Sequence, residues 1–233
     1  MRKRDFERMY NPCGLTFPKR LAKRSAFCAA QRFVAPKEIY CDSMITPIEN
    51  QGSLPWCAAY SASNFAECVL WKKRGYPPEI DPAPIYRHAK TIDGDPEGDG
   101  TLLECAMDGL LELGLFDREI CRIKTFGGSL FGFGNDGLNA VKFAIHRYGC
   151  CIAGFQITSD WYTPVNGVLK GGNGSTLGGH AVTICGYDEG GVMIANSWGK
   201  EWAHEGKVYM PNDIFNRQFI YGCVITRCLD GLE

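Results

Sequence analysis

A change of hydrophobic periodicity near Gly149 is the feature that most constrains this fold. Before that residue, apolar side chains recur at helical spacing, and one stripe in residues 57–75 contains Ala62, Phe65 and Val69. After it, short runs of β-branched and aromatic residues are separated by Gly-rich turns, as is typical of strands. Because helices and strands are segregated along the chain, the sequence predicts an α+β fold of two lobes, with a binding site in the groove between them.

The expected elements follow from these patterns and from capping signals. Thr101 and Glu104 have the spacing of a capping box, which predicts a helix that begins near Thr101 and ends at Gly114. The other helices are expected at 57–75, 82–90 and 137–148, and strands at 150–158, 180–187, 192–197, 207–210 and 219–226.

Composition excludes several classes of protein. The chain has 233 residues, 45% of them hydrophobic and 22% charged, which is enough to bury a substantial core and excludes disorder or a collagen-like repeat. No apolar run approaches the roughly 20 residues that span a bilayer. The basic start at residues 1–4 is followed by charged residues rather than by the apolar region of a signal peptide. We therefore expect a cytoplasmic or virion-associated protein without membrane contact.

Charge is distributed unevenly along the chain. Residues 1–35, the basic arm, contain nine basic and two acidic residues, a net charge of +7. Residues 36–233 contain 16 basic and 24 acidic residues, a net charge of −8. The basic arm is either solvated, folded back onto the acidic body, or a contact for a partner such as nucleic acid. Nucleic acid is the least favoured of these, because neither a recognised motif nor interleaved aromatic residues accompany the charges.

Cys57 stands out among the 12 cysteines because it lies at the N-terminus of the first predicted helix. There the positive end of the helix dipole favours a thiolate and lowers the pKa of the thiol, as a nucleophile requires. No two cysteines have the spacing Cys-x-x-Cys, so neither a zinc ribbon nor a thioredoxin-type redox site is expected. We predict no metal and no cofactor.

Three separated segments resemble those of papain-like cysteine peptidases, in the order found in that family. Gln51 stands six residues before Cys57, as a glutamine does before the family's reactive cysteine. His180 and Asn196 follow Cys57 by 123 and 139 residues, close to the roughly 130–150 typical of the family. The weaker parts of the resemblance extend it to about residues 36–226. The three segments are residues 51–61 around the nucleophile, residues 179–187 as the histidine strand, and residues 196–206 as the asparagine segment.

The resemblance implies a papain-like two-lobe fold with the active site in the cleft between the lobes. It places the peptidase domain at residues 36–233, with a helical lobe over about 42–148 and a β-barrel-like lobe over about 149–226. The remaining residues, 1–35, are then a basic N-terminal arm or a short pro-like segment.

The resemblance also implies a chemical role for each of four residues. Cys57 would attack the scissile carbonyl of a polypeptide substrate, while His180 takes the thiol proton and returns it to the leaving amine. Asn196 would orient the imidazole, and the side chain of Gln51 would stabilise the oxyanion together with the Cys57 backbone N–H. The residues implied at the bound substrate are Trp198, which would also shield the His180–Asn196 bond from water, and Asp99, Gly100, Gly154, Gly178 and Gly179.

The chain departs from the family in ways that bear on regulation and specificity. Secreted members carry a disulfide-bonded cysteine three residues before the nucleophile, where this chain has Leu54, and no cysteine lies near Asp99 to pair with it. This difference fits a reducing compartment. Only about 35 residues precede the domain, so we expect a bacterial, phage or viral-type member without the long inhibitory prodomain. Gly178 and Gly179 are expected to widen the second substrate pocket for bulky apolar side chains.

Two other functions use the same residues. A papain-like acyltransferase or transpeptidase would transfer the acyl group to an amine instead of water. A non-catalytic papain-like binding module would have lost the catalytic pair, whereas here Cys57, His180, Asn196 and Gln51 are all present. Cysteine-type endopeptidase activity is therefore the leading prediction.

Overall fold

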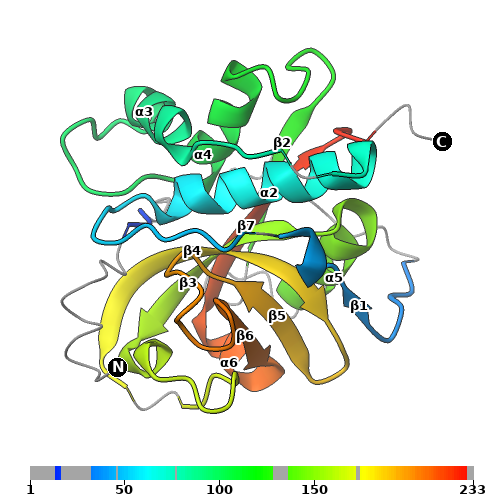
Figure 1. Ribbon diagram of the computed structural model, residues 1–233, viewed down its shortest axis with the longest axis vertical. Coiled ribbons are helices and arrows are strands. Elements are labelled where there is room, and N and C mark those ends of the chain that lie inside the picture. Colours follow the sequence, from blue (N-terminus) through cyan, green and yellow to red (C-terminus); the bar gives the residue numbers. More distant parts are fainter. Residues whose placement is uncertain are drawn as a thin grey trace.

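The computed structural model describes residues 14–16, 33–45, 47–76, 78–127, 136–171 and 174–229. A long helix, α2, crosses the middle of the molecule, with α3 and α4 on one side of it and most of an antiparallel sheet on the other (Figure 1). The elements are β1 (Ile39–Tyr40), the 3-10 helix η2 (Asp42–Met44), α2 (Cys57–Arg74), α3 (Pro82–Ile92), α4 (Leu103–Glu112), β2 (Arg122–Gly127), α5 (Asp136–Tyr148), β3 (Cys151–Thr158), the 3-10 helix η4 (Ser159–Tyr162), β4 (Thr176–Tyr187), β5 (Gly191–Ala195), β6 (Lys207–Pro211), α6 (Asn212–Gln218) and β7 (Phe219–Thr226).

Helix α2 is the buried axis of the fold. Three cations, Lys72, Lys73 and Arg74, occupy its last turn, where they suit the negative end of the dipole, and Gly75 ends it in the left-handed conformation with φ of 80°. The sequence predicts a single apolar stripe, but residues 61–70 are buried on every face. The helix packs against α3 and α4 on one side and against β3 and β4 on the other, so even its polar positions lose contact with water.

The sheet joins segments that lie far apart in the sequence. Its strand order is β2-β7-β3-β4-β5-β6, with antiparallel neighbours, and β1 pairs with the outer end of β4. Gly154 of β3 lies opposite Ala181 of β4 on one side and Tyr221 of β7 on the other. The predicted α+β fold of the papain type is confirmed, both by this architecture and by its likeness to solved structures described below.

Some local predictions differ from the structure. Helix α4 begins at Leu103 rather than Thr101, and the Thr101 hydroxyl donates to Asp93 Oδ2 at 2.9 Å instead of capping the helix. Strand β2 was not expected, because its six residues acquire an apolar face only by pairing with β7. The seven-residue helix α6 is too short to show a helical period, and it is anchored by buried Ile214 and Phe215.

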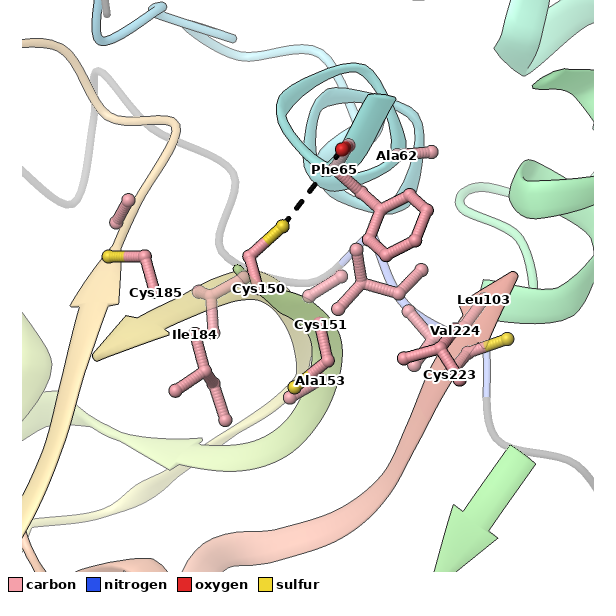
Figure 2. Packing of buried hydrophobic residues seen from close by; sticks show 14 of the residues in the cluster. Ala62, Phe65, Leu103, Cys150, Cys151, Ala153, Ile184, Cys185, Cys223 and Val224 are labelled. Atoms are coloured by element: carbon pink, nitrogen blue, oxygen red, sulfur yellow. Dashed lines mark hydrogen bonds between the residues drawn. The ribbon is translucent and has the colours of Figure 1, made fainter. Parts of the chain in front are cut away.

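Cysteines contribute to the core as small apolar residues. Figure 2 shows Cys150, Cys151 and Cys223 among the side chains that pack beneath α2, with the Cys150 thiol 3.9 Å from the Phe65 carbonyl oxygen. Burial raises the pKa of the Cys150, Cys151 and Cys223 thiols, so these groups stay protonated and unreactive. None of the ten cysteines in the described part of the chain forms a disulfide.

Among the helices of the described residues, none combines the length and the apolar composition needed to cross a bilayer.

We expect Phe155→Ala to lower the free energy of unfolding by about 3–5 kcal/mol. Phe155 is completely buried in β3, and its ring lies 5.6–5.8 Å from the rings of Trp161, Phe215 and Phe219. Urea denaturation followed by circular dichroism measures the loss. Tyr76→Ala is the matched control, because Tyr76 is 60% exposed and its truncation should change the stability by no more than about 0.5 kcal/mol.

Candidate active site

Cys57 is the first residue of α2, directly after the N-cap Trp56. Its side chain is fully buried, and its Sγ lies 3.4 Å from the backbone N of Ala181, the residue after His180 on β4. Two elements more than a hundred residues apart therefore meet at this thiol. The helix N-terminus and the Ala181 N–H both present positive partial charge to the sulfur, which favours the thiolate.

Asn196 and Trp198, both in the asparagine segment, hold the imidazole of His180. Its Nε2 lies 2.8 Å from Asn196 Oδ1, and Oδ1 also accepts the Ser197 backbone N–H at 2.8 Å. Because the Ser197 N–H identifies Oδ1 as an acceptor, His180 must carry a proton on Nε2. The Trp198 ring packs on the imidazole with centroids 4.8 Å apart. His180, Asn196 and Trp198 are all fully buried, so water is excluded from the His180–Asn196 bond.

Gln51 is fixed by the same asparagine segment. Its backbone N donates to the Ser197 carbonyl at 2.8 Å, and its side-chain oxygen accepts the Ser197 hydroxyl. The amide nitrogen of Gln51 donates to the Leu54 carbonyl at 2.8 Å, within the loop that leads to Cys57. Ser197 thus joins the glutamine and asparagine segments. The sequence predicts no role for Ser197, although its position next to Asn196 is a usable signal.

Residues 14–16 lie against several of the residues that the family resemblance implies for substrate binding. Thr101 N donates to Gly14 O at 3.1 Å, and Thr16 N donates to Thr101 O at 3.0 Å, which makes a short parallel bridge. Leu15 N also faces Gly179 O at 3.3 Å. A segment of this chain is therefore hydrogen-bonded to Thr101, which precedes α4, and to Gly179 of β4.

Leu15 fills the space that small residues leave open. It is only 7% exposed, and a Cβ added at Gly154 would lie 2.5 Å from its Cδ2 atom. Gly179 is buried beside it and Gly178 is half-buried, whereas Asp99 is exposed. The structure therefore brings Gly100, Gly154 and Gly179 against residues 14 and 15. It places Asp99 at the rim of this region and Trp198 beneath the imidazole.

Two largely buried carboxyl groups link α2 to the segments that flank it. Glu49 accepts a hydrogen bond from Ser63 at 3.2 Å, and Glu67 accepts one from the Ile80 backbone N–H at 3.1 Å. Burial raises the pKa of Glu49 to about 7 and that of Glu67 to about 8, and the negative charge of nearby Glu79 adds to both shifts. Both groups are therefore largely protonated in mildly acidic solution.

The fold is shared with solved cysteine proteases. Xylellain, a cysteine protease from Xylella fastidiosa, superposes with a TM-score of 0.70 at 17% identity, over 92% of this chain and 96% of that one. ProCathepsin B S9 from Trypanosoma congolense gives a TM-score of 0.69 at 16% identity, over 96% of this chain and 88% of that one. At these identities the likeness establishes the fold, which is papain-like.

Sequence comparison relates part of the chain to a known family. Residues 131–226 match the model of the family described as "Papain family cysteine protease". The gut-specific cysteine proteinase of Caenorhabditis elegans is 34% identical over 96 residues, 39% of this chain and 29% of that protein. Cathepsin B-like cysteine proteinase 3 of Ostertagia ostertagi is 35% identical over 97 residues, 40% of this chain and 55% of that protein. The matches thus span less than a third of the first relative and about half of the second. The likeness to papain family cysteine proteases therefore covers residues 131–226 in sequence and most of the chain in fold.

We expect the stability of the protein to fall as the pH rises from about 4.5 to about 8. The ordinary pKa of a glutamate is 4.5, and in the fold that of Glu67 is about 8, so between these values the native state binds a proton that the unfolded chain releases. The stabilisation is complete below 4.5 and is lost as the pH passes 8, by at most about 1.4 kcal/mol per pH unit for each such carboxyl.

Urea titrations at a series of pH values measure this slope in the unmodified protein and in Glu67→Gln. The variant keeps an oxygen that can accept the Ile80 N–H and should show a shallower decline. Glu97→Gln, at an exposed position, is the control and should reproduce the slope of the unmodified protein. An equal slope in all three proteins would contradict the assignment to Glu67.

Proposed function

We propose that this chain is a cysteine peptidase that hydrolyses internal peptide bonds of polypeptides. The observation that carries the proposal is the meeting of Cys57, His180 and Asn196, which come from α2, from β4 and from the segment after β5. Three unrelated segments place a thiol, an imidazole and an orienting amide in one buried cluster, which is the arrangement that nucleophilic catalysis by cysteine requires.

The proposed reaction begins with the transfer of the Cys57 thiol proton to His180. Because Nε2 already carries a proton and faces Asn196, the transferred proton goes to Nδ1. The thiolate attacks the carbonyl carbon of the scissile bond, the C–N bond breaks, and the leaving amine takes the proton from Nδ1. Water, deprotonated by His180, then hydrolyses the thioester and regenerates the free thiol.

Two donors are proposed to stabilise the oxyanion of this reaction. The backbone N–H of Cys57 belongs to the first turn of α2, whose N–H groups point out of the helix end. The side-chain amide of Gln51 has two hydrogens, one of which binds the Leu54 carbonyl. The same amide is proposed as the second donor to the oxyanion. The bonds from Ser197 to the Gln51 oxygen and backbone support this role, because they restrict the rotation of the amide.

The substrate is proposed to be an extended peptide with an apolar side chain in the pocket around Gly154. Leu15 packs at that position, which supports a preference for apolar side chains of similar size. The backbone groups of Thr101 and Gly179 that bind residues 14–16 are of the kind that bind any extended chain, so they add affinity without selecting a sequence. Gly178 and Gly179 place no bulk beside the pocket, which favours large apolar residues.

The basic arm, residues 1–35, is proposed to act as a short pro-like segment that blocks the cleft from within the chain. Residues 14–16 take the position of a substrate, and the net charge of +7 on the arm opposes the net charge of −8 on residues 36–233. Both effects favour an arm that stays bound at low ionic strength. The arm is displaced when the contacts of residues 14–16 or the charge attraction are weakened.

We expect an epoxide thiol probe to label Cys57 selectively and a fluorogenic peptide with leucine in the pocket position to be cleaved. Cys57→Ala and His180→Ala should each lower turnover by at least about a thousandfold, because nucleophile and base act as one unit. Cys105→Ala, which removes a buried thiol on α4, is the matched control and should leave labelling and turnover unchanged. Labelling without turnover would favour an acyl-transfer enzyme, and the absence of selective labelling would favour a binding module.

We expect Leu15→Asp to increase both the rate of Cys57 labelling and peptide turnover by about tenfold or more. The substitution places a charge in an apolar pocket and removes the burial of a leucine side chain, so the arm should leave the cleft. Leu113→Asp is the control, because Leu113 is 44% exposed and lies outside the arm. Equal rates for the unmodified and Leu15→Asp proteins would contradict the blocking role.

A further inference from the structure

One wall of the cleft is a two-residue stretch of backbone, Gly100–Thr101, that no strand supports. It lies between the end of α3 and the start of α4, and it forms both hydrogen bonds to Gly14 and Thr16. The approach is close, since a Cβ added at Gly100 would lie only 2.2 Å from Gly14 O. A displacement of well under 1 Å would therefore break or crowd these bonds, and the stretch must be held in place.

The stretch is tied to the last turn of α3 by two hydrogen bonds. Lys90 Nζ donates to Gly100 O at 2.9 Å, and the Thr101 hydroxyl donates to Asp93 Oδ2 at 2.9 Å.

Lys90 and Asp93 are also paired with each other, at 2.7 Å. The two side chains and the Gly100–Thr101 backbone thus form a closed ring of interactions. The side chains are only 13% and 4% exposed, so this pair is shielded from water and salt in a way that surface ion pairs are not. Asp93 Oδ1 accepts the Asp95 backbone N–H at 3.0 Å, which leaves both carboxylate oxygens in use.

The charge state of Asp93 agrees with this arrangement. Burial by itself would raise the pKa of the carboxyl, but hydrogen bonds from Lys90, from the Asp95 N–H and from Thr101 outweigh it and lower the pKa below its usual 3.8. The Asp93 carboxylate is therefore charged throughout the pH range in which a thiol enzyme would be assayed.

We propose that Lys90 and Asp93 are positioning residues for peptide binding, which hold the Gly100–Thr101 backbone in register with an extended chain in the cleft. Lys90 fixes the Gly100 carbonyl, and Asp93 fixes the Thr101 side chain. Together they point the Thr101 N–H and C=O at the bound chain. The proposal rests on the proposed function in one respect, that the ligand of the cleft is a peptide.

The first test measures peptide turnover in the Leu15→Asp protein, where the arm no longer competes. In that background Asp93→Asn and Lys90→Met should each raise KM by about tenfold while kcat changes by less than about twofold, because neither residue touches the reacting atoms. The double variant should be little worse than either single variant, since both act through the same stretch of backbone.

Asp108→Asn is the matched control for this test. Asp108 of α4 binds His88 of α3 at 2.8 Å, so its loss loosens the same helix without touching Gly100 or Thr101. KM in this control should stay unchanged. An equal rise in KM for Asp108→Asn, or a fall in kcat at constant KM for Asp93→Asn, would overturn the positioning role.

The second test does not depend on catalysis. In the otherwise unmodified chain, Asp93→Asn should speed hydrogen exchange of the Thr101 and Thr16 amides by about tenfold, while the Ala89 amide within α3 keeps its rate. Uniform acceleration across α3, or no change at Thr101, would overturn the proposal. Absence of peptide turnover in the Leu15→Asp protein would contradict the proposed function alone, because the exchange experiment still tests the ring of interactions.

Discussion

The packing of α2 between the helices and the sheet is the constraint on which the rest of the structure depends. Its N-terminus must meet β4 where His180 and Ala181 stand, because the Cys57 thiol is held by the Ala181 N–H. The burial of residues 61–70 on every face leaves the helix little freedom to slide or rotate. The buried helix α2 therefore positions the Cys57 thiol, and strand β4 positions the His180 imidazole.

Around that junction, hydrogen bonds between loops take over from apolar packing. The glutamine segment and the asparagine segment are joined at Ser197, and Gly199 N adds a bond to Glu49 O at 2.9 Å. Each bond lies in a region closed to water, where an unpaired polar group would be costly. The donor proposed for the oxyanion and the amide that orients His180 are thus parts of one network, and disturbing one should disturb the other.

The proposed cleft is built on a different principle from the cluster around Cys57. Its proposed walls are the backbone groups of Thr101 and Gly179 together with Gly154, against which Leu15 packs, so they suit an extended chain rather than a particular sequence. In the proposed arrangement, the shielded ion pair of Lys90 and Asp93 fixes the wall at Thr101. Residues 14–16 bind the same backbone groups, so the arm and a peptide substrate are proposed to occupy one site.

The sequence by itself determined the elements with a strong period, because helix signals are local properties of the chain. It also led to the prediction that Gln51, Cys57, His180 and Asn196 form the site, through the order and spacing of motifs that resemble a known family. It did not reveal β2, whose apolar face exists only against β7, nor α6, which is shorter than two full helical periods. The sequence predicted that Thr101 caps α4, but its hydroxyl donates to Asp93 instead. Only the tertiary structure decided that Leu15 fills the pocket at Gly154 and that Lys90 and Asp93 support the cleft wall. These contacts depend on the distance between segments that no sequence pattern records.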